Sequence, residues 1–493
     1  MHYKSTRDSK NVVTPSQAIL QGLATDGGLY VPVALPTFDL DWKKLSQYSY
    51  QEMASYILQP FLSDFSKEQL EECIHKAYDD KFDTEAIAPI RKAGENYYLE
   101  LFHGSTIAFK DMALSILPYL MKTSAEINGN TNEIIILTAT SGDTGKAAMA
   151  GFSDVDGTNI IVFYPKGGVS SIQEQQMLTQ TGKNTHVVSI IGNFDDAQTE
   201  VKNLFNDLEL REELLENGSQ FSSANSMNIG RLVPQIVYYF YAYSQMVKEG
   251  HIQAGEAINF SVPTGNFGNI LAAYYAKECG LPINKLICAS NDNKVLFDFF
   301  KDGKYDRLRE FILTISPSMD ILVSSNLERL VYYAVQEDSQ RLTELMEQLS
   351  QHGQYQLTDE EQAKFTDFLS AYVTEAETKK EIAEVFEQSG YIIDPHTAVG
   401  SKAWRKLQDD QSIDSPVVVV STASPYKFPE AVLNALNITT DSMTDLDLLT
   451  HLHDLSKVPY PPAIDGLLDA ERLHDTTLEV SQMRDYVRQL AHQ

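Results

Sequence analysis

Short runs of apolar residues recur from about residue 96 to residue 290 and alternate with segments whose apolar residues follow helical spacing. Several of these runs are continuously apolar, which is typical of parallel strands that helices cover on both faces. The pattern therefore predicts an α/β fold built on buried parallel strands. Strands are expected at residues 97–101, 133–139, 159–164, 186–190, 258–262 and 285–289, with one more at residues 416–421.

The chain divides into four segments by composition and pattern. Residues 1–90 carry helical spacing and turn signals, and we expect them to form an N-terminal subdomain. Residues 91–215 are expected to form a first α/β domain. Residues 216–436 should form a second one, with a helical insertion near 300–390 that is clearest from residue 326. Residues 437–493 are predicted to be an acidic, mostly helical extension.

Charge and composition exclude several classes of protein. The 39 Lys and Arg residues against 68 Asp and Glu residues give a net charge of −29, which argues against nucleic acid as a partner. No apolar run is long enough for a transmembrane helix or a signal peptide, so we expect a cytoplasmic protein with no membrane partner. Cys73, Cys279 and Cys288 lack the spacing of a disulfide framework or a metal site, and no metal is expected.

A turn rich in glycine and asparagine follows the predicted strand at 258–262. Its glycines allow a sharp bend that brings backbone N–H groups to one point, and the helix that follows adds partial positive charge. Such a turn can bind a phosphate, although an ordinary strand-to-helix turn explains the same residues. A Walker motif and the dinucleotide fingerprint are both excluded, because the lysine of the first and the glycine spacing of the second are absent. The predicted phosphate-binding turn consists of Gly265, Asn266, Phe267, Gly268 and Asn269.

Lys110 lies among apolar residues between a predicted strand and a helix-like run. Its neighbours Ala108, Phe109 and Met112 would partly desolvate the amine, lower its pKa from about 10.4 and free it to attack a carbonyl carbon. A lysine that forms a Schiff base requires such an environment. A surface lysine paired with Asp111 is the alternative interpretation.

A second loop of small and hydroxylated residues follows the predicted strand at 133–139 and precedes a helix. Its hydroxyl groups and the helix N-terminus suit a carboxylate, although N-capping by Ser141 or Asp143 explains the residues equally well. Together, two turns suited to anions and one partly buried lysine fit a ligand with a phosphate, an aldehyde and a carboxylate-bearing amine. The loop contains Ser141, Gly142, Asp143 and Thr144.

The chain resembles the threonine synthase family, in the long form found in bacteria and fungi, among the fold type II pyridoxal-phosphate enzymes. The most specific part of the resemblance is Phe-Lys-Asp at 109–111 together with Gly-Asn-Phe-Gly-Asn at 265–269. The resemblance implies a tryptophan synthase β-like architecture of two open twisted α/β domains, with an N-terminal subdomain and helical insertions. The matching segments, in the family's order, are 5–7, 21–30, 103–111, 141–145, 225–228, 263–269, 394–398 and 421–423.

The resemblance implies pyridoxal 5'-phosphate as the cofactor and assigns residues to it. Lys110 would hold the cofactor as a Schiff base, and the turn at 265–269 would bind its phosphate. Thr422 would hydrogen-bond the pyridine nitrogen. A neutral hydroxyl there does not enforce a protonated ring, so the cofactor would be a less extreme electron sink.

The resemblance also assigns residues to the substrate. The loop at 141–145 would bind the substrate carboxylate, with Asp143 near the hydroxyl of the cofactor ring. Arg231 is a candidate for the substrate's own phosphate because its guanidinium offers a fork of donors. A salt bridge on a helix surface is the alternative for this arginine. The other candidates for this phosphate site are Asn225, Ser226 and Asn228.

Some positions depart from the family pattern. Ser105 stands where relatives often have proline, and Ser424 and Tyr426 stand where a histidine and a small residue are common. The second departure weakens any role for a histidine beside the pyridine ring. His396 could carry protons near the site or simply cap a helix.

The resemblance implies a lyase that converts O-phospho-L-homoserine and water to L-threonine and phosphate, in the last step of threonine biosynthesis. One alternative is another fold type II lyase or dehydratase that acts on a hydroxylated or phosphorylated amino acid. Another alternative is a non-catalytic relative that binds a metabolite. The expected partner is the small-molecule substrate, with the protein as a monomer or homodimer.

Overall fold

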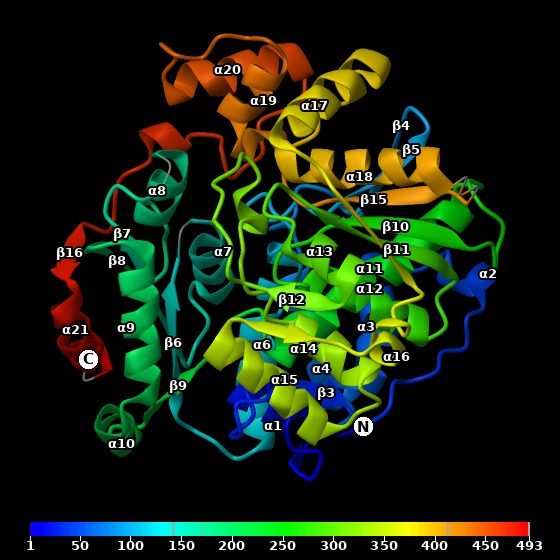
Figure 1. Ribbon diagram of the computed structural model, residues 1–493. Helices are drawn as coiled ribbons and strands as arrows, with labels where there is room; N and C mark the ends of the chain where they lie inside the picture. Colours follow the sequence, from blue (N-terminus) through cyan, green and yellow to red (C-terminus); the bar gives the residue numbers. More distant parts are fainter. Residues whose placement is uncertain (141, 170, 412, 414, 492–493) are drawn as a thin grey trace.

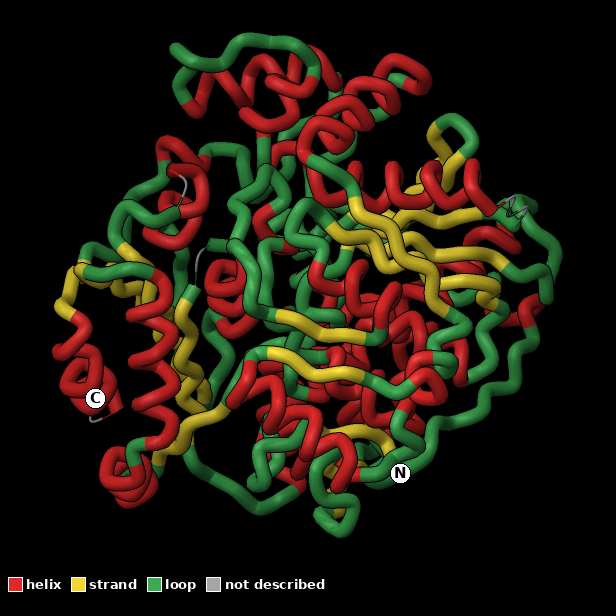
Figure 2. The backbone as a smooth tube through the Cα atoms, in the orientation of Figure 1, coloured by secondary structure: helices red, strands yellow, loops and turns green. Residues whose placement is uncertain are grey.

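The computed structural model folds the chain around two open sheets, the larger at the upper right of Figure 2 and the smaller at the left. Helix α11 (Ile229–Lys248) runs through the molecule below the larger sheet, and most of its residues are buried (Figure 1). Among the described residues, no helix has both the length and the apolar character needed to cross a membrane. The structure describes residues 1–140, 142–169, 171–411, 413 and 415–491.

The larger sheet has six strands, and all neighbours are parallel except the hairpin of β4 and β5. Helices cover both faces of the sheet, with α18 (Pro395–Gln411) above it and α11 and α12 (Gly268–Glu278) below it in Figure 1. Its central strands β10 and β15 are therefore buried along their whole length. In spatial order the strands are β14 (Phe368–Tyr372), β11 (Ile283–Ser290), β10 (Ile258–Pro263), β15 (Val417–Ser421), β5 (Asn96–Glu100) and β4 (Ile90–Ala93).

The smaller sheet has five parallel strands, and both of its faces are also buried. Successive residues of the interior strand β6 (Glu133–Ala139) show why: Ile134 packs into the main core with α7 (Asp143–Phe152), whereas Ile135 packs with α9 (Phe194–Asn206) and α21 (Met483–Ala491). A strand buried on both sides needs a continuous apolar run. In spatial order the strands are β16 (Thr476–Glu479), β8 (Thr185–Ile191), β7 (Thr158–Pro165), β6 (Glu133–Ala139) and β9 (Ser219–Ser222).

The other elements pack around these two sheets. The N-terminal subdomain contains β1 (Tyr3–Ser5), β2 (Val12–Val13), α1 (Pro15–Gln21), β3 (Tyr30–Pro32), α2 (Trp42–Leu45), α3 (Tyr50–Phe61) and α4 (Lys67–Ala77). Helices α5 (Asp111–Leu114) and α6 (Leu117–Ile127) connect β5 to β6, whereas α8 (Ser171–Leu178) and α10 (Leu208–Glu216) lie in the connections of the smaller sheet. The insertion contains α13 (Val295–Asp302), β12 (Lys304–Asp306), η1 (Pro317–Met319), α14 (Leu327–Ala334), α15 (Ser339–His352), β13 (Gln354–Gln356), α16 (Asp359–Gln362) and α17 (Glu375–Ser389). The C-terminal part contains η2 (Pro425–Lys427), α19 (Pro429–Ala435), α20 (Asp445–Ser456), η3 (Leu467–Asp469) and η4 (Val480–Gln482).

The predicted α/β class with buried parallel strands is confirmed. Each predicted strand forms within one or two residues of its expected bounds, as β5, β6, β7, β8, β10, β11 and β15. The domain boundaries at residues 90, 215 and 436 stay a prediction. Two strand pairings connect the predicted segments: β5 pairs with β15 of the later segment, and β16 of the C-terminal segment joins the smaller sheet.

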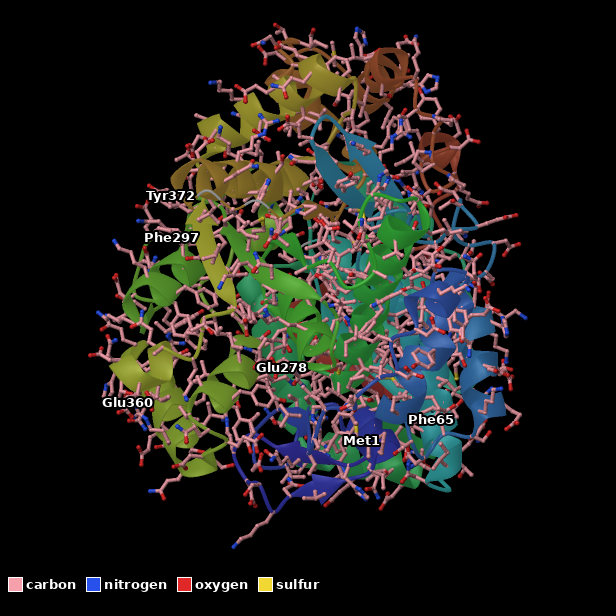
Figure 3. The ribbon with its side chains drawn as sticks, turned by 90° about the vertical axis from the view of Figure 1, so that its right-hand side faces the viewer. Met1, Phe65, Glu278, Phe297, Glu360 and Tyr372 are labelled. Atoms are coloured by element: carbon pink, nitrogen blue, oxygen red, sulfur yellow. The ribbon has the colours of Figure 1, made fainter. Side chains whose placement is uncertain are left out.

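Two stretches that the sequence predicts as helical, or in the acidic tail as mostly helical, also contain strands. In the insertion, β14 adds an edge to the larger sheet, and the ring of its Tyr372 lies 5.0 Å from that of Phe297 (Figure 3). In the acidic tail, β16 pairs with β8. Both strands lie at sheet edges and keep half-buried residues, so neither shows the apolar run of a central strand.

His103 connects β5 to the N-terminal subdomain through two carboxylates. Its Nδ1 lies 2.5 Å from Asp83 and its Nε2 lies 2.9 Å from Glu100. Partial burial alone would lower the pKa of His103, but the hydrogen bonds to Asp83 and Glu100 outweigh burial and raise the pKa from 6.5 to about 9. The protonated imidazole therefore bridges the two carboxylates at neutral pH.

This raised pKa predicts a pH-dependent stability. A folded-state pKa above the unfolded one gives stabilisation that is complete below pH 6.5 and is lost as the pH rises through about 9. Between pH 6 and pH 9.5 we expect the wild type to lose about 2 kcal/mol more unfolding free energy than His103→Gln. Urea unfolding at the two pH values measures this difference, and equal losses in the two proteins would contradict the bridge.

Candidate active site

Lys110 and Thr422 come together at the carboxyl ends of two neighbouring parallel strands, β5 and β15. The segments that follow these strands run side by side: the N–H of Phe109 donates to the carbonyl of Thr422 at 2.8 Å, and the N–H of Ser424 donates to the carbonyl of Ile107 at 3.0 Å. Ligands of α/β proteins bind at this edge of a sheet. The two residues that the resemblance assigns to opposite parts of one cofactor are therefore neighbours.

The amine of Lys110 lies in an environment that disfavours its charge. Burial is the largest effect and lowers the pKa of Lys110, and the cations Lys427 and Arg231 lower it further, while Asp143 acts in the opposite sense. Asp111 does not pair with it, because its buried carboxylate accepts hydrogen bonds from the N–H and hydroxyl of Thr106 at 2.8 and 2.6 Å. Lys110 is thus a nucleophile candidate and not a paired surface lysine.

Asp143, at the start of α7, pairs with a lysine that the sequence analysis did not single out. The Nζ of Lys427 lies 3.2 Å from Asp143 and also donates to the carbonyl of Thr106 at 2.8 Å. Burial alone would raise the pKa of Asp143, but Lys427, Lys110 and a 2.9 Å hydrogen bond from Gln173 outweigh burial and lower it. A fixed carboxylate therefore joins the smaller sheet to the C-terminal side of the larger one, beside Lys110.

The rest of the loop around Asp143 is held from inside. The hydroxyl of Thr140 accepts hydrogen bonds from the N–H groups of Gly142 and Gly145, both at 3.0 Å. Gly142 has a φ of 143°, and a Cβ there would lie 2.5 Å from the Gln173 side chain, so only glycine fits. Thr144 is half-buried on the first turn of α7. Ser141, which was predicted to belong to this loop, lies outside the described residues.

The predicted phosphate-binding turn connects β10 to α12. Phe267 adopts a left-handed φ of 69° while its side chain, 1% exposed, packs against Phe300 and Phe368 and fixes the turn to the core. The turn's carbonyls are bound from behind, since Ser324 donates its hydroxyl to Gly265 at 2.7 Å. In the described part of the chain, no acceptor engages the backbone N–H groups of residues 265–268. These donors are free to face an anion.

Asn269 ends this turn with an unpaired buried donor. Its Oδ1 accepts hydrogen bonds from the hydroxyls of Tyr238 and Tyr239, both at 2.6 Å, which fixes which end of the amide carries the NH₂ group. Its Nδ2 is buried and has no partner among the described residues. A buried donor without an acceptor costs free energy, so this geometry favours an anion beside Asn269.

The segment before α11 contains three residues that were predicted to bind the substrate phosphate. Asn228 caps α11: its Oδ1 accepts from Gly230 N–H at 2.8 Å, and its Nδ2 donates to the carbonyls of Ile19 and Ser223 at 3.0 and 2.9 Å. Its polar atoms are therefore engaged by backbone, and it positions the segment. Asn225 is exposed and Ser226 is half-buried.

Arg231 is a buried cation that has no counter-ion among the described residues. It is 5% exposed, its Nη1 donates to the carbonyl of Ala224 at 3.0 Å, and its Nε has no partner in the described part of the chain. No carboxylate of the described residues pairs with it, and burial lowers its pKa to about 10. The alternative of a helix-surface salt bridge therefore fails, and the guanidinium is suited to an anionic ligand.

His396 is engaged at both ring nitrogens. Its Nε2 accepts a hydrogen bond from the N–H of Ser318 at 3.1 Å, so Nδ1 carries the proton toward Asp394 at 2.8 Å. The carbonyl of Ser318 in turn lies against Gly265, where a Cβ would come within 2.5 Å of it. His396, near the start of α18, thus supports the turn at 265–269, which favours its structural interpretation.

Sequence reasoning missed several residues around this site. Lys427 and Gln173 carry no distinguishing local pattern, and only the fold brings them to Asp143. Tyr238 and Tyr239 lie in a long apolar helix, so the sequence indicates only that they are buried in the core. The role of such residues becomes visible only from their tertiary contacts.

Comparisons with known proteins agree on one family. A model of pyridoxal-phosphate dependent enzymes matches residues 86–423, and models of the threonine synthase N terminus and C-terminal part match residues 2–78 and 397–487. Threonine synthase of Pseudomonas aeruginosa is 39% identical over 444 residues, which are 88% of this chain and 90% of that protein. Threonine synthase-like 1 of Macaca fascicularis is 40% identical over 467 residues, 92% of this chain but only 62% of that longer protein.

A crystal structure points the same way. Threonine synthase from Brucella melitensis with bound pyridoxal phosphate has a TM-score of 0.89 and 36% sequence identity, and the match covers 100% of each chain. Fold and sequence thus agree along the entire chain. The chain belongs to the threonine synthase family of fold type II pyridoxal-phosphate enzymes, and its cofactor is pyridoxal phosphate.

Proposed function

We propose that this protein converts O-phospho-L-homoserine and water to L-threonine and phosphate. The observation that carries the proposal is the buried Arg231, which has no carboxylate partner among the described residues and is close enough to Lys110 to lower the pKa of that amine. The turn at 265–269 already supplies donors for the cofactor phosphate. A second anion-binding group beside the reactive lysine calls for a substrate that carries a phosphate of its own.

The residues present fit the cofactor. The unpaired buried Nδ2 of Asn269 and the free N–H groups of residues 265–268 supply donors for a phosphate. Lys110 supplies an amine for the aldehyde, and Thr422, 5% exposed, lies on the segment paired with it. When bound, pyridoxal phosphate supplies an electron-withdrawing ring that stabilises negative charge at the substrate Cα.

Each residue of the site then has a defined task. The Lys110 amine, with its lowered pKa, is the base that takes the proton from the substrate Cα and returns one there at the end. The same amine serves the transfer of a proton from Cβ and to Cγ that accompanies loss of the phosphate, and water then adds at Cβ to supply the hydroxyl group. Arg231 binds the departing phosphate, and the loop at 142–145 orients the substrate carboxylate.

The predicted cytoplasmic location stays a prediction.

A coupled product assay tests the proposal. Purified holoprotein is incubated with O-phosphohomoserine, and phosphate and threonine are measured together; equal amounts of the two are expected. Phosphate accompanied by 2-oxobutanoate and ammonia in place of threonine would favour the alternative of a different lyase. Absence of phosphate release from a fully loaded protein would favour a metabolite-binding relative.

Asn269→Asp is expected to weaken cofactor binding while leaving the fold intact. The aspartate keeps the acceptor that Tyr238 and Tyr239 bind, but it replaces the free donor with a negatively charged oxygen. The dissociation constant of pyridoxal phosphate should rise about a hundredfold. Equilibrium dialysis of the apoprotein measures it, with Tyr239→Phe as a milder control. An unchanged constant would mean that Asn269 does not face the cofactor phosphate.

A further inference from the structure

Two fully buried residues next to the site, Asn326 and Arg329, connect segments that are far apart in the sequence. Both are 0% exposed and lie at the start of α14, in the insertion. Asn326 precedes the first residue of the helix, and the Nη1 of Arg329 donates to its Oδ1. Together they form one rigid unit, the Asn326–Arg329 pair.

The first segment that this unit holds is the phosphate-binding turn. The backbone N–H of Asn326 donates to the carbonyl of Asn266 at 3.0 Å. The Cβ that any other residue would place at Gly268 would lie 3.5 Å from the Nδ2 of Asn326. The turn is therefore attached to Asn326 through a backbone hydrogen bond, and the Asn326 side chain lies beside Gly268.

The second segment leads into α11 and to Arg231. The Nδ2 of Asn326 donates to the carbonyl of Ser226 at 3.2 Å, and the Nη2 of Arg329 donates to the carbonyl of Met227 at 2.7 Å. The Nε of Arg329 donates to the carbonyl of Tyr30 at 2.8 Å, which fixes the unit to β3. All three nitrogens of the Arg329 guanidinium therefore donate to backbone carbonyls or to Asn326. By contrast, the Nε of Arg231 has no partner among the described residues.

We propose that Asn326 and Arg329 are positioning residues that fix the spacing between the cofactor phosphate turn and Arg231, and so determine the length of phosphorylated substrate that the site accepts. The inference rests on the proposed function. Both anion-binding groups are attached to the same buried unit, so their separation is set by hydrogen bonds that do not involve a ligand. A substrate whose phosphate is one carbon nearer to its Cα cannot both engage the cofactor held at the turn and reach Arg231 equally well.

Ligand length provides the test. The probes are a non-hydrolysable phosphonate of the same length as O-phosphohomoserine and its homologue that is one methylene shorter, titrated into holoprotein by calorimetry. The variants are Asn326→Ser and Arg329→Lys, which remove side-chain links to residues 226 and 227 but keep the backbone N–H of residue 326. The control is Glu328→Gln on the same helix, which loses the ion pair to Arg7 at 2.8 Å but keeps an amide oxygen for the hydrogen bonds from the Thr6 hydroxyl and Arg7 Nε.

The wild type and Glu328→Gln are expected to bind the longer phosphonate at least about tenfold more tightly than the shorter one. In Asn326→Ser and Arg329→Lys the ratio should fall to about one, while pyridoxal phosphate affinity changes by less than about threefold in Asn326→Ser because the turn keeps its backbone bond. An unchanged ratio in both variants, or the same loss in Glu328→Gln, would overturn the inference. Binding of neither phosphonate by the wild type would overturn the proposed function and the inference with it.

Discussion

Replacing Lys110 with alanine is expected to lower the rate of phosphate release from O-phosphohomoserine by about a thousandfold or more, because the residue is both the covalent anchor of the cofactor and the proposed base. The variant should still bind pyridoxal phosphate, since the phosphate donors at 265–269 are untouched. It should do so without a borohydride-reducible bond. Burial lowers the pKa of Lys110 and so favours the neutral, nucleophilic form of the amine.

A neighbouring lysine makes this test specific. Lys146, on α7, is also partly buried, and burial followed by the charge of Lys427 lowers its pKa to about 8. It donates a 2.6 Å hydrogen bond to Gln180 and is an alternative point of attachment by pKa alone. After borohydride reduction, peptide mass analysis should find the cofactor on residue 110 in the wild type and in Lys146→Met. A label that survives in Lys110→Ala, or disappears in Lys146→Met, would contradict the assignment.

The fold was predictable where burial on both faces forces a sequence pattern. Several interior strands of the two sheets carry a continuous apolar run. An example is β6, whose successive residues pack into two different cores. The edge strands β14 and β16 meet solvent or a single neighbour, and their mixed composition gave no signal. Pairing at an edge depends on a partner strand that local sequence does not reveal.

The site was predictable where backbone geometry imposes residue type, and unpredictable where only tertiary contact does. Gly265 has to be glycine because the carbonyl of Ser318 leaves no room for a Cβ, and such constraints leave a readable motif. Lys427 and Asn326 act through side-chain contacts to residues far away in the sequence, so nothing in their own segments marks them. Asn228 shows a different problem. The same asparagine side chain suits a helix N-cap and a ligand-binding site, so the sequence alone does not distinguish the two roles.

Arg231→Met should change stability and activity in opposite directions. In the folded protein burial lowers the pKa of Arg231 from 12.5 to about 10, so at neutral pH folding must bury a charge that has no described counter-ion. A methionine of similar length removes that cost, and its loss of the hydrogen bond to Ala224 offsets only part of the gain. We expect the unfolding free energy of the apoprotein to rise by about 1 to 2 kcal/mol.

The same substitution should lower kcat/KM for O-phosphohomoserine by about a hundredfold or more, because the substrate phosphate loses its charged donor. Urea unfolding of the apoprotein and steady-state kinetics of the holoprotein measure the two effects on one preparation. Arg329→Met is the matched control: its guanidinium donates to carbonyls and to Asn326, so removing it should destabilise the fold. Removing a residue that serves only packing lowers the unfolding free energy. Removing a buried charged residue that serves a ligand raises it. If Arg231→Met destabilised the apoprotein and left kcat/KM unchanged, Arg231 would be a structural residue and the substrate phosphate would have to bind elsewhere.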